Sequence, residues 1–277
     1  HYMCPRNIDG KNIADYTFEE FEKDVYPTLK KEGIKFSSIG SPIGKVGIDD
    51  EEGFAKQKQQ LAELVKIAQL MKCEYIRIFS FFYGDKKPED CSAKVISRLK
   101  ELLAIVKGSG VKLMHENEKR IYGDVPSRVL EIYNAINDDD FVLCFDASNY
   151  IQCDVNPKEA FDTLKDLVVY YHIKDCSTYK VEVPVGTGEG HYEYIVGQLK
   201  ARGYEGFMTL EPHTFKYAVM KPLVYFVPFV KFAMKDYFKA FRLIDKKMGR
   251  NYFACASRET VFLWQYNNLK KLISEAK

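Results

Sequence analysis

Short apolar runs recur along the chain, and a stretch with helical spacing of apolar positions follows each of them. Two clear examples are Phe141–Asp146 (Phe-Val-Leu-Cys-Phe-Asp) and Val168–Asp175 (Val-Val-Tyr-Tyr-His-Ile-Lys-Asp). Continuous apolar runs of this length indicate strands buried on both faces, as in parallel sheets. The predicted strands begin near residues 34, 75, 111, 141, 168 and 207, and Tyr2–Arg6 adds a strand end. This βα repeat predicts parallel strands joined by right-handed crossovers.

Helix starts between these runs carry recognisable capping patterns. Thr17-Phe18-Glu19-Glu20 fits a capping box, and Asn156-Pro157-Lys158-Glu159 combines an N-cap residue with proline at the first helical position. Near the C-terminus, apolar stripes predict one helix over Phe229–Lys247 and another over Arg258–Ala276. We therefore expect helices to follow the strands, with an extra helical tail at the end.

The length of 277 residues is close to the roughly 250 residues of a single (β/α)8 barrel. We predict the α/β class and one TIM barrel domain over residues 1–277, with residues 253–277 as a helical C-terminal extension. Only seven strands are counted where the barrel needs eight. Either the first β/α unit is missing or rearranged, or Tyr252–Ala256 supplies a late strand.

The net charge indicates which binding partners are expected, and the cysteine pattern indicates the redox state of the thiols. Lys and Arg (41) nearly balance Asp and Glu (39), which gives a net charge of +2 and argues against nucleic acid or an anionic membrane as a partner. The seven cysteines form no C-x-x-C pair, which is typical of reduced thiols. No secretory leader pattern is present at the start. We expect a cytoplasmic protein, and a homo-oligomer is possible.

Four predicted strands end in residues that can bind a metal ion: Glu116, Asp146, His172 and Glu211. The carboxyl ends of parallel barrel strands open onto one face, so these side chains can converge. Any one of them alone is an ordinary surface carboxylate or a hydrogen-bonded histidine. Together, three oxygen donors and one nitrogen suit one divalent ion, Mn²⁺, Mg²⁺ or Co²⁺, with Zn²⁺ as a further candidate. His115 should face away from Glu116 because strand side chains alternate.

A divalent ion at this position suggests chemistry next to a carbonyl group. Its charge stabilises a developing enediolate oxygen, and a carboxylate nearby moves the proton. Two glutamates, Glu116 and Glu211, allow a proton to be removed from one face of the substrate and returned on another. Epimerisation requires this arrangement.

Several motifs in this order resemble the xylose isomerase-like superfamily of TIM barrels, with a likeness from about Arg6 to Tyr252. The motifs are His-Glu-Asn-Glu (His115–Glu118), Phe-Asp-Ala-Ser-Asn (Phe145–Asn149), His-Ile-Lys-Asp (His172–Asp175), Leu-Glu-Pro-His (Leu210–His213), Ser-Pro-Ile-Gly-Lys (Ser41–Lys45) and Arg-Ile-Phe-Ser-Phe (Arg77–Phe81). The superfamily contains sugar and sugar-phosphate isomerases and epimerases. Hydroxypyruvate isomerase, dehydroshikimate dehydratase and endonuclease IV are relatives.

The resemblance implies roles for the strand-end residues. In epimerases of that family the matching residues bind one divalent metal, often manganese, and the two glutamates are the acid and base. It therefore implies Glu116 and Glu211 as catalytic ligands, and Asp146 and His172 as ligands. Members usually begin with a strand and helix upstream of Cys4, so the first β/α unit is again the doubtful part.

Substrate contacts are expected around these ligands. The resemblance points to Asn149, Lys174 and Asp175, with Lys174 and Asp175 as substrate or ligand-supporting contacts. Further candidates are Glu118 and His213 at the strand ends, and Lys45 and Arg77, which could neutralise a phosphate.

The predicted function is a metal-dependent sugar or sugar-phosphate isomerase or epimerase. One alternative is a lyase of the dehydroshikimate dehydratase type, and another is a non-catalytic sugar-binding or scaffold barrel. Gly186–Gly190 lacks nucleotide-binding spacing and is expected to be a tight loop.

Overall fold

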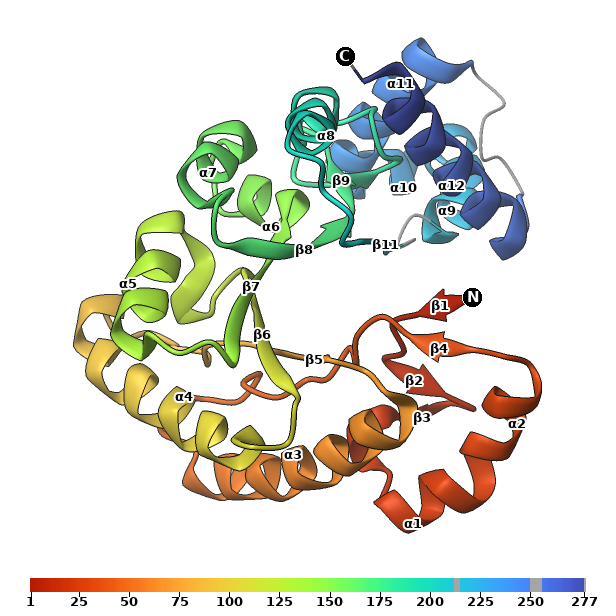
Figure 1. Cartoon of the computed structure of the whole chain (residues 1–277). Helices are drawn as coiled ribbons and strands as arrows, with labels where there is room; N and C mark the ends of the chain where they lie inside the picture. Colours follow the sequence, from red (N-terminus) through yellow and green to blue (C-terminus); the bar gives the residue numbers. More distant parts are fainter. Residues whose placement is uncertain (212–214, 250–255, 277) are drawn as a thin grey trace. The chain divides into compact units, whose positions relative to one another are not determined.

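The computed structural model describes residues 1–211, 215–249 and 256–276 (Figure 1). The strands are β1 (Tyr2–Met3), β2 (Asn7–Ile8), β3 (Lys11–Asn12), β4 (Lys35–Phe36), β5 (Tyr75–Ile78), β6 (Lys112–Glu116), β7 (Phe141–Asp146), β8 (Val168–Ile173), β9 (Asp175–Cys176), β10 (Glu182–Val183) and β11 (Phe207–Leu210). The six predicted strand starts from residue 34 onward are confirmed to within one residue. The late strand proposed for Tyr252–Ala256 falls largely on 252–255, outside the described residues.

Helices separate these strands. They are α1 (Phe18–Glu20), α2 (Tyr26–Lys31), α3 (Glu51–Met71), α4 (Ser92–Val106), α5 (Pro126–Ile136), α6 (Ala147–Gln152), α7 (Pro157–Leu164), α8 (Tyr192–Ala201), α9 (Phe215–Phe226), α10 (Pro228–Ala233), α11 (Lys235–Met248) and α12 (Arg258–Glu275). The two predicted caps are confirmed. Thr17 Oγ1 accepts the Glu20 N–H at 3.2 Å, and Asn156 Oδ1 accepts the Lys158 N–H at 2.9 Å.

Five of the strands form one sheet in the order β5-β6-β7-β8-β11. The β5–β6 and β6–β7 pairs are parallel, with Tyr75 opposite Lys112 and Glu116 opposite Cys144. β1 pairs in parallel with β4, and a parallel bridge joins Ile39 to Ile76 of β5. A parallel sheet with a helix after each long strand confirms the predicted α/β class.

The chain divides into two compact units, residues 1–145 with 166–170, and residues 146–165 with 171–277. Whether they make one domain over 1–277 stays a prediction. The first unit has a core that includes Phe21, Phe36 and Leu61, all at most 3% exposed. In its core the Tyr170 hydroxyl shares a hydrogen bond of 2.8 Å with Ser37.

The second unit contains the C-terminal helices. Val183, Val224, Phe241, Ile244 and Val261 belong to one buried cluster, so a strand, α9, α11 and α12 share a core. Polar contacts reinforce it, because buried Gln265 on α12 accepts the N–H of Val185 at 3.0 Å. The predicted helical tail is therefore a packed part of this unit.

The prediction of one continuous helix over Phe229–Lys247 is wrong, because the segment is interrupted. Met234 has non-helical dihedral angles (φ −118°, ψ 42°), and the segment forms two helices, α10 and α11. Both α10 and α11 contact α9. One straight helix over the same residues would not contact α9 along its whole length. Among the described residues, no helix is both long enough and apolar enough to cross a bilayer.

Candidate metal centre

The four predicted ligands lie at or next to strand ends. Glu116 is the last residue of β6 and Asp146 the last of β7, while His172 precedes the last residue of β8 and Glu211 follows β11. The first three are at most 2% exposed. The final residues of parallel strands lie at one edge of the sheet. Apolar runs that each end in a polar residue therefore place these polar side chains at the same edge.

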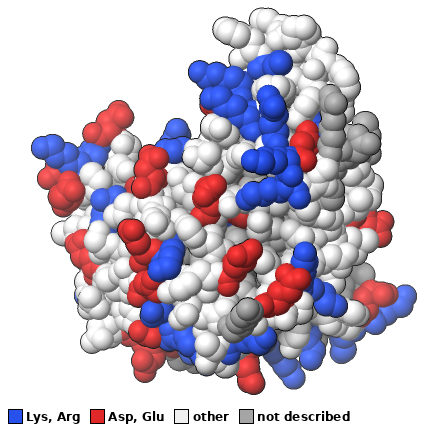
Figure 2. All heavy atoms as spheres, turned by 90° about the horizontal axis from the view of Figure 1, so that it is seen from above, with Lys and Arg blue, Asp and Glu red and all other residues white. Residues whose placement is uncertain are grey.

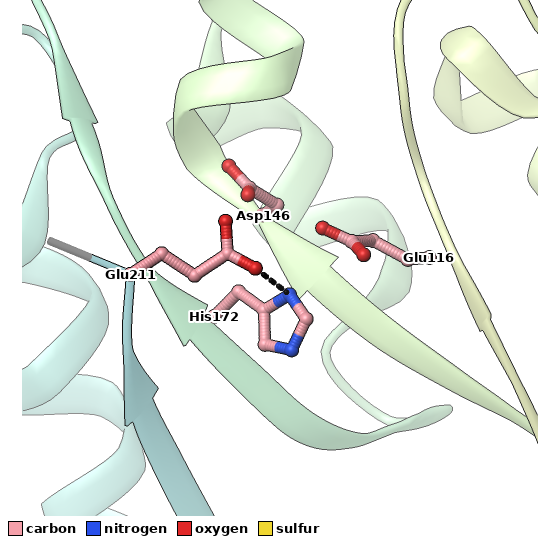
Figure 3. A group of neighbouring side chains, drawn as sticks. All are labelled: Glu116, Asp146, His172 and Glu211. Carbon is pink, nitrogen blue, oxygen red and sulfur yellow. Dashed lines mark ion pairs between the residues drawn. The ribbon is translucent and has the colours of Figure 1, made fainter. Parts of the chain in front are cut away.

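The structure brings these four side chains together, and Figure 3 shows them pointing toward one another. Each offers one ligand atom, and these atoms all lie within 4.8 Å of one another. The donor set of three carboxylates and one imidazole suits a divalent cation.

Glu116 is held by a buried cation. Nη1 of Arg77, on β5, lies 3.1 Å from Glu116 Oε2, and both side chains are at most 4% exposed. The same guanidinium donates from Nη2 to the carbonyl of Gly40 at 3.1 Å. The sequence suggests Arg77 as a phosphate contact, and the structure places its guanidinium beside Glu116, one of the predicted ligands. Its role toward substrate stays a prediction.

Asp146 has two local functions. Its Oδ1 accepts the N–H of Asn149 at 3.0 Å and so caps α6, which turns the chain sharply after β7. Its Oδ2 lies 2.9 Å from Nζ of Lys174. Asn149 is 2% exposed, and its predicted substrate contact stays a prediction.

Lys174 bridges two of the predicted ligands. Its ammonium lies 3.3 Å from Glu211 Oε2, in addition to the contact with Asp146, and the side chain is 6% exposed. The other oxygen of Glu211 lies 3.3 Å from Nδ1 of His172 (Figure 3). A buried cation among carboxylates reduces their mutual repulsion, which helps such a cluster to exist in the fold.

Tyr192 fixes the backbone of Lys174, a contact that the sequence analysis missed. The tyrosine hydroxyl accepts the N–H of Lys174 at 3.0 Å and donates to its carbonyl at 2.7 Å. Burial raises the pKa of this hydroxyl well above its usual value, so it stays protonated. The available signal was its position as the first residue of α8, two residues after the last glycine of the glycine-rich loop.

Asp175 organises that loop, which confirms the tight-loop prediction for Gly186–Gly190. Its carboxylate accepts the N–H groups of Gly186, Gly188 and Gly190 at 2.8–2.9 Å, and the N–H of Cys176 at 2.8 Å. Burial raises the pKa of Asp175 to about 6, and the four N–H groups oppose this shift. A Cβ at position 188 would lie 2.3 Å from the Cys176 carbonyl oxygen, so glycine is required there.

His115 is completely buried beside Glu116 in sequence. Its ring stacks on Phe141 with centroids 6.0 Å apart, as the packing interpretation expects. Desolvation lowers its pKa to about 4, so the imidazole is neutral at pH 7.

The remaining predicted contacts are more exposed. Glu118 pairs with Lys45 at 2.9 Å, and Lys45 Nζ lies 4.1 Å from the ring centroid of Phe79. Their contact with substrate stays a prediction. His213 lies outside the described residues.

Comparisons with known proteins identify the family and the fold of this chain. A family model described as xylose isomerase-like TIM barrel matches residues 3–223. Among curated proteins, none matches the chain.

Three solved structures are similar in fold. An IolI protein with a bound zinc atom has a TM-score of 0.69 at 15% identity, covering 100% of this chain and 89% of that one. A xylose isomerase-like TIM barrel protein from Mycobacterium smegmatis in complex with magnesium has 0.63 at 18%, covering 76% of each chain. A D-tagatose 3-epimerase-like protein has 0.61 at 16%, covering 81% and 80%. These likenesses confirm the predicted fold, and with the family match over residues 3–223, the chain belongs to the xylose isomerase-like TIM barrel family.

Proposed function

We propose that this protein is a metal-dependent sugar or sugar-phosphate isomerase or epimerase that transfers a proton next to a carbonyl group. One observation carries the proposal: ligand atoms of Glu116, Asp146, His172 and Glu211 all lie within 4.8 Å of one another. The names of several structural neighbours support it. They include D-allulose 3-epimerase from Methylomonas sp. and L-ribulose 3-epimerase, each 15% identical.

The four side chains would hold one divalent ion, for which we propose Mn²⁺. Two structural neighbours, one with a bound zinc atom and one in complex with magnesium, support a divalent ion here and make Zn²⁺ and Mg²⁺ the ions to compare with Mn²⁺. When bound, the ion stabilises negative charge that develops on a substrate oxygen. The protein then has to hold the substrate and move the proton.

Glu116 and Glu211 are the proposed proton-transfer groups. They come from different strands, β6 and β11, so they can serve different faces of a bound substrate. Arg77 orients Glu116 through their buried ion pair, and His172 contacts Glu211. Removal of the α-proton by one glutamate and return by the other inverts a carbon centre through an enediolate.

Lys174 and Asn149 are proposed to bind substrate oxygens. The Lys174 ammonium is already within 3.3 Å of two carboxylates, and Tyr192 holds its backbone in place. A sugar hydroxyl or carbonyl that reaches this cluster would find a cationic donor beside the acid and base.

Metal content tests the first half of the proposal. Protein purified without chelator or added metal, and again after incubation with Mn²⁺, is analysed by mass spectrometry together with Asp146→Ala and the control Glu101→Ala. Glu101 is an exposed carboxylate that pairs with Lys58 at 2.8 Å. About one equivalent in the parent and in Glu101→Ala, lost in Asp146→Ala, is expected. No metal after loading would contradict the centre.

Proton exchange tests the second half. Metal-loaded protein is incubated with ketoses and ketose phosphates in D₂O, and deuterium at the carbon next to the carbonyl is followed by NMR. Glu116→Gln and Glu211→Gln should each slow exchange by about 10²- to 10⁴-fold, whereas Glu101→Gln should not. If both glutamine variants retain full exchange, the two glutamates are not the acid and base.

Elimination is the competing chemistry. A neighbour 17% identical is named as a probable 3-dehydroshikimate dehydratase from Bacillus anthracis. Incubation with 3-dehydroshikimate and analysis of released product separates the two reactions. Loss of water without exchange into any ketose would favour the lyase, and binding of sugars without either reaction would favour a scaffold.

A further inference from the structure

The C-terminal helices carry a local excess of positive charge that the whole-chain balance conceals. Residues 221–247 contain seven Lys or Arg and two Asp, a net charge of +5, although the whole chain has a net charge of only +2. Figure 2 shows Lys and Arg atoms gathered in a band on the face seen from above. A local single-sign field of this kind attracts ligands of the opposite charge.

On α11 the basic residues follow one face of the helix. Lys235, Lys239, Arg242 and Lys246 are spaced by four, three and four positions, so each is a neighbour of the next on the helix surface. The opposite face buries Ala240, Phe241 and Ile244 in the hydrophobic cluster of this unit. The basic stripe is therefore fixed on the solvent side of a packed helix.

Like charges at these spacings destabilise a helix, whereas other helices of the chain place opposite charges there. On α7, Lys158 pairs with Asp162 at 3.2 Å, and on α12, Lys271 pairs with Glu275 at 3.9 Å. The helix dipole favours Lys246 in the last turn of α11, but it does not explain Lys239 or Arg242 in the middle. A stripe that costs stability suggests a binding role.

Three of these cations line a cavity of about 920 Å³ within the second unit. Its lining residues are Tyr179, Tyr225, Lys231, Phe238, Lys239, Arg242, Leu243, Asp245 and Lys246. The cavity thus contains four cations, Lys231 from α10 and three from α11.

The cavity's single carboxylate does not neutralise these four cations. Asp245 forms an ion pair with buried Lys221, and the Tyr225 hydroxyl donates to it. Within residues 1–211, 215–249 and 256–276, no carboxylate lies within salt-bridge distance of Lys231, Arg242 or Lys246. Lys239 has only an exposed contact of 3.5 Å with Asp236.

The walls of the cavity include aromatic rings that hold two of the ammonium groups. Lys231 Nζ lies 4.2 Å from the ring centroid of Phe238, and Lys239 Nζ lies 5.0 Å from that of Tyr179. Cation–π contacts leave the ammonium hydrogens available to an anion. Arg242 adds a guanidinium that can bind two phosphate oxygens at once.

We propose that this cavity is a binding site for a small molecule that carries a polyphosphate group. Four cations in one cavity, with the carboxylate of Asp245 already paired, match a ligand with three or four negative charges. None of the four proposed metal ligands lines the cavity, and its test does not depend on the proposed reaction.

Calorimetric titration of the full chain with inorganic tripolyphosphate at about 0.15 M salt, where the Debye length is only about 8 Å, tests the proposal. Arg242→Glu and Lys246→Glu should each weaken binding by at least about tenfold, because each removes a charge-assisted contact and adds repulsion. Lys235→Glu is the matched control: it makes the same charge change on the same helix, but Lys235 does not line the cavity. We expect a change of less than about twofold there.

Thermal unfolding shows whether each variant is still folded when its binding is measured. Arg242→Glu should retain the parent melting temperature or raise it, since it relieves like-charge neighbours, so lost binding in this variant would not reflect misfolding. Lys246→Glu should lower the melting temperature slightly, because the helix dipole disfavours a carboxylate in the last turn, and it should still unfold in one cooperative transition. No heat of binding in the parent, or equal loss in Lys235→Glu, would overturn the proposal. So would binding to mixed phosphatidylcholine and phosphatidylserine vesicles without binding to tripolyphosphate, which would assign the surface to lipid headgroups.

Discussion

At the ends of β6 and β7, Glu116 and Asp146 are buried, and each lies close to a cation, Arg77 or Lys174. On α11, Arg242 and Lys246 are exposed, and no described carboxylate lies within salt-bridge distance of them. Burial forces charges to pair, because an isolated charge in the interior costs several kcal/mol, whereas water screens like charges on a surface. The two regions therefore carry their charges differently: one as a paired buried cluster, the other as an exposed cluster with no described carboxylate within salt-bridge distance of Arg242 or Lys246.

Removing one partner of a buried pair should give the largest effect on stability. Arg77→Met leaves Glu116 without its cation and should lower the free energy of unfolding by about 3–5 kcal/mol, measured by urea denaturation of metal-free protein. The double variant Arg77→Met/Glu116→Gln should recover part of that loss, because no buried charge is then unpaired. If the free energy of unfolding of Arg77→Met falls by less than about 1 kcal/mol, Glu116 does not depend on the buried cation for its stability in the fold.

Asp175→Asn extends the comparison to a buried carboxylate that has no cation within salt-bridge distance in the described part of the chain. Its oxygens accept four backbone N–H groups, and an amide would turn NH₂ toward some of them. We expect a loss of about 3 kcal/mol in the free energy of unfolding, again by urea denaturation. Asp154→Asn is the surface control, since its side chain is 78% exposed, and it should change stability by less than about 0.5 kcal/mol.

The buried residue His115 extends the comparison of buried and exposed groups to the pH dependence of stability. The folded-state pKa of His115 is lowered to about 4 from 6.5, so below pH 6.5 the unfolded chain binds a proton that the folded chain does not. Stability from this residue is present above pH 6.5 and is lost as pH falls toward 4, by about 2 kcal/mol between pH 7 and pH 5.

His115→Asn should remove that part of the pH dependence, measured as the free energy of unfolding at pH 7 and pH 5. His191→Asn, at an exposed position, is the control and should keep the parent profile. An unchanged profile in His115→Asn would show that its imidazole is not desolvated.

The smallest effect is expected on α11. Arg242→Glu should raise the free energy of unfolding by a few tenths of a kcal/mol, because it places a glutamate four residues before Lys246 and three after Lys239. Measured losses above about 1 kcal/mol would mean that Arg242 has a structural role and that the surface is not under charge repulsion.

Much of the predicted site could be read directly from the chain. Buried strands appear as continuous apolar runs, and a polar residue at the end of such a run has a predictable position at the edge of a parallel sheet. This is why Glu116, Asp146, His172 and Glu211 were identified together and why the structure brings them together. The cap at Thr17 was also predictable, because the side chain bonds to a backbone group only three residues away.

Contacts between distant segments were not predictable in this way. The ion pair of Arg77 with Glu116 was not predicted, nor was the binding of Tyr192 to the backbone of Lys174. Asp175 shapes the loop of Gly186–Gly190. Each partner is 11 to 39 positions away along the chain, so only the packing of strands and helices decides which groups meet.

The sequence by itself determined the βα order, the strand ends and the chemical types of the four proposed ligands, because these depend on local hydrophobic patterns and on residue identity. The tertiary structure alone decided that the tail breaks at Met234 and that cations from α10 and α11 line one cavity. The net charge of +2 over the whole chain does not reveal such a local group of cations. Charge summed along a chain does not record position, and electrostatic attraction depends on the distances that folding sets.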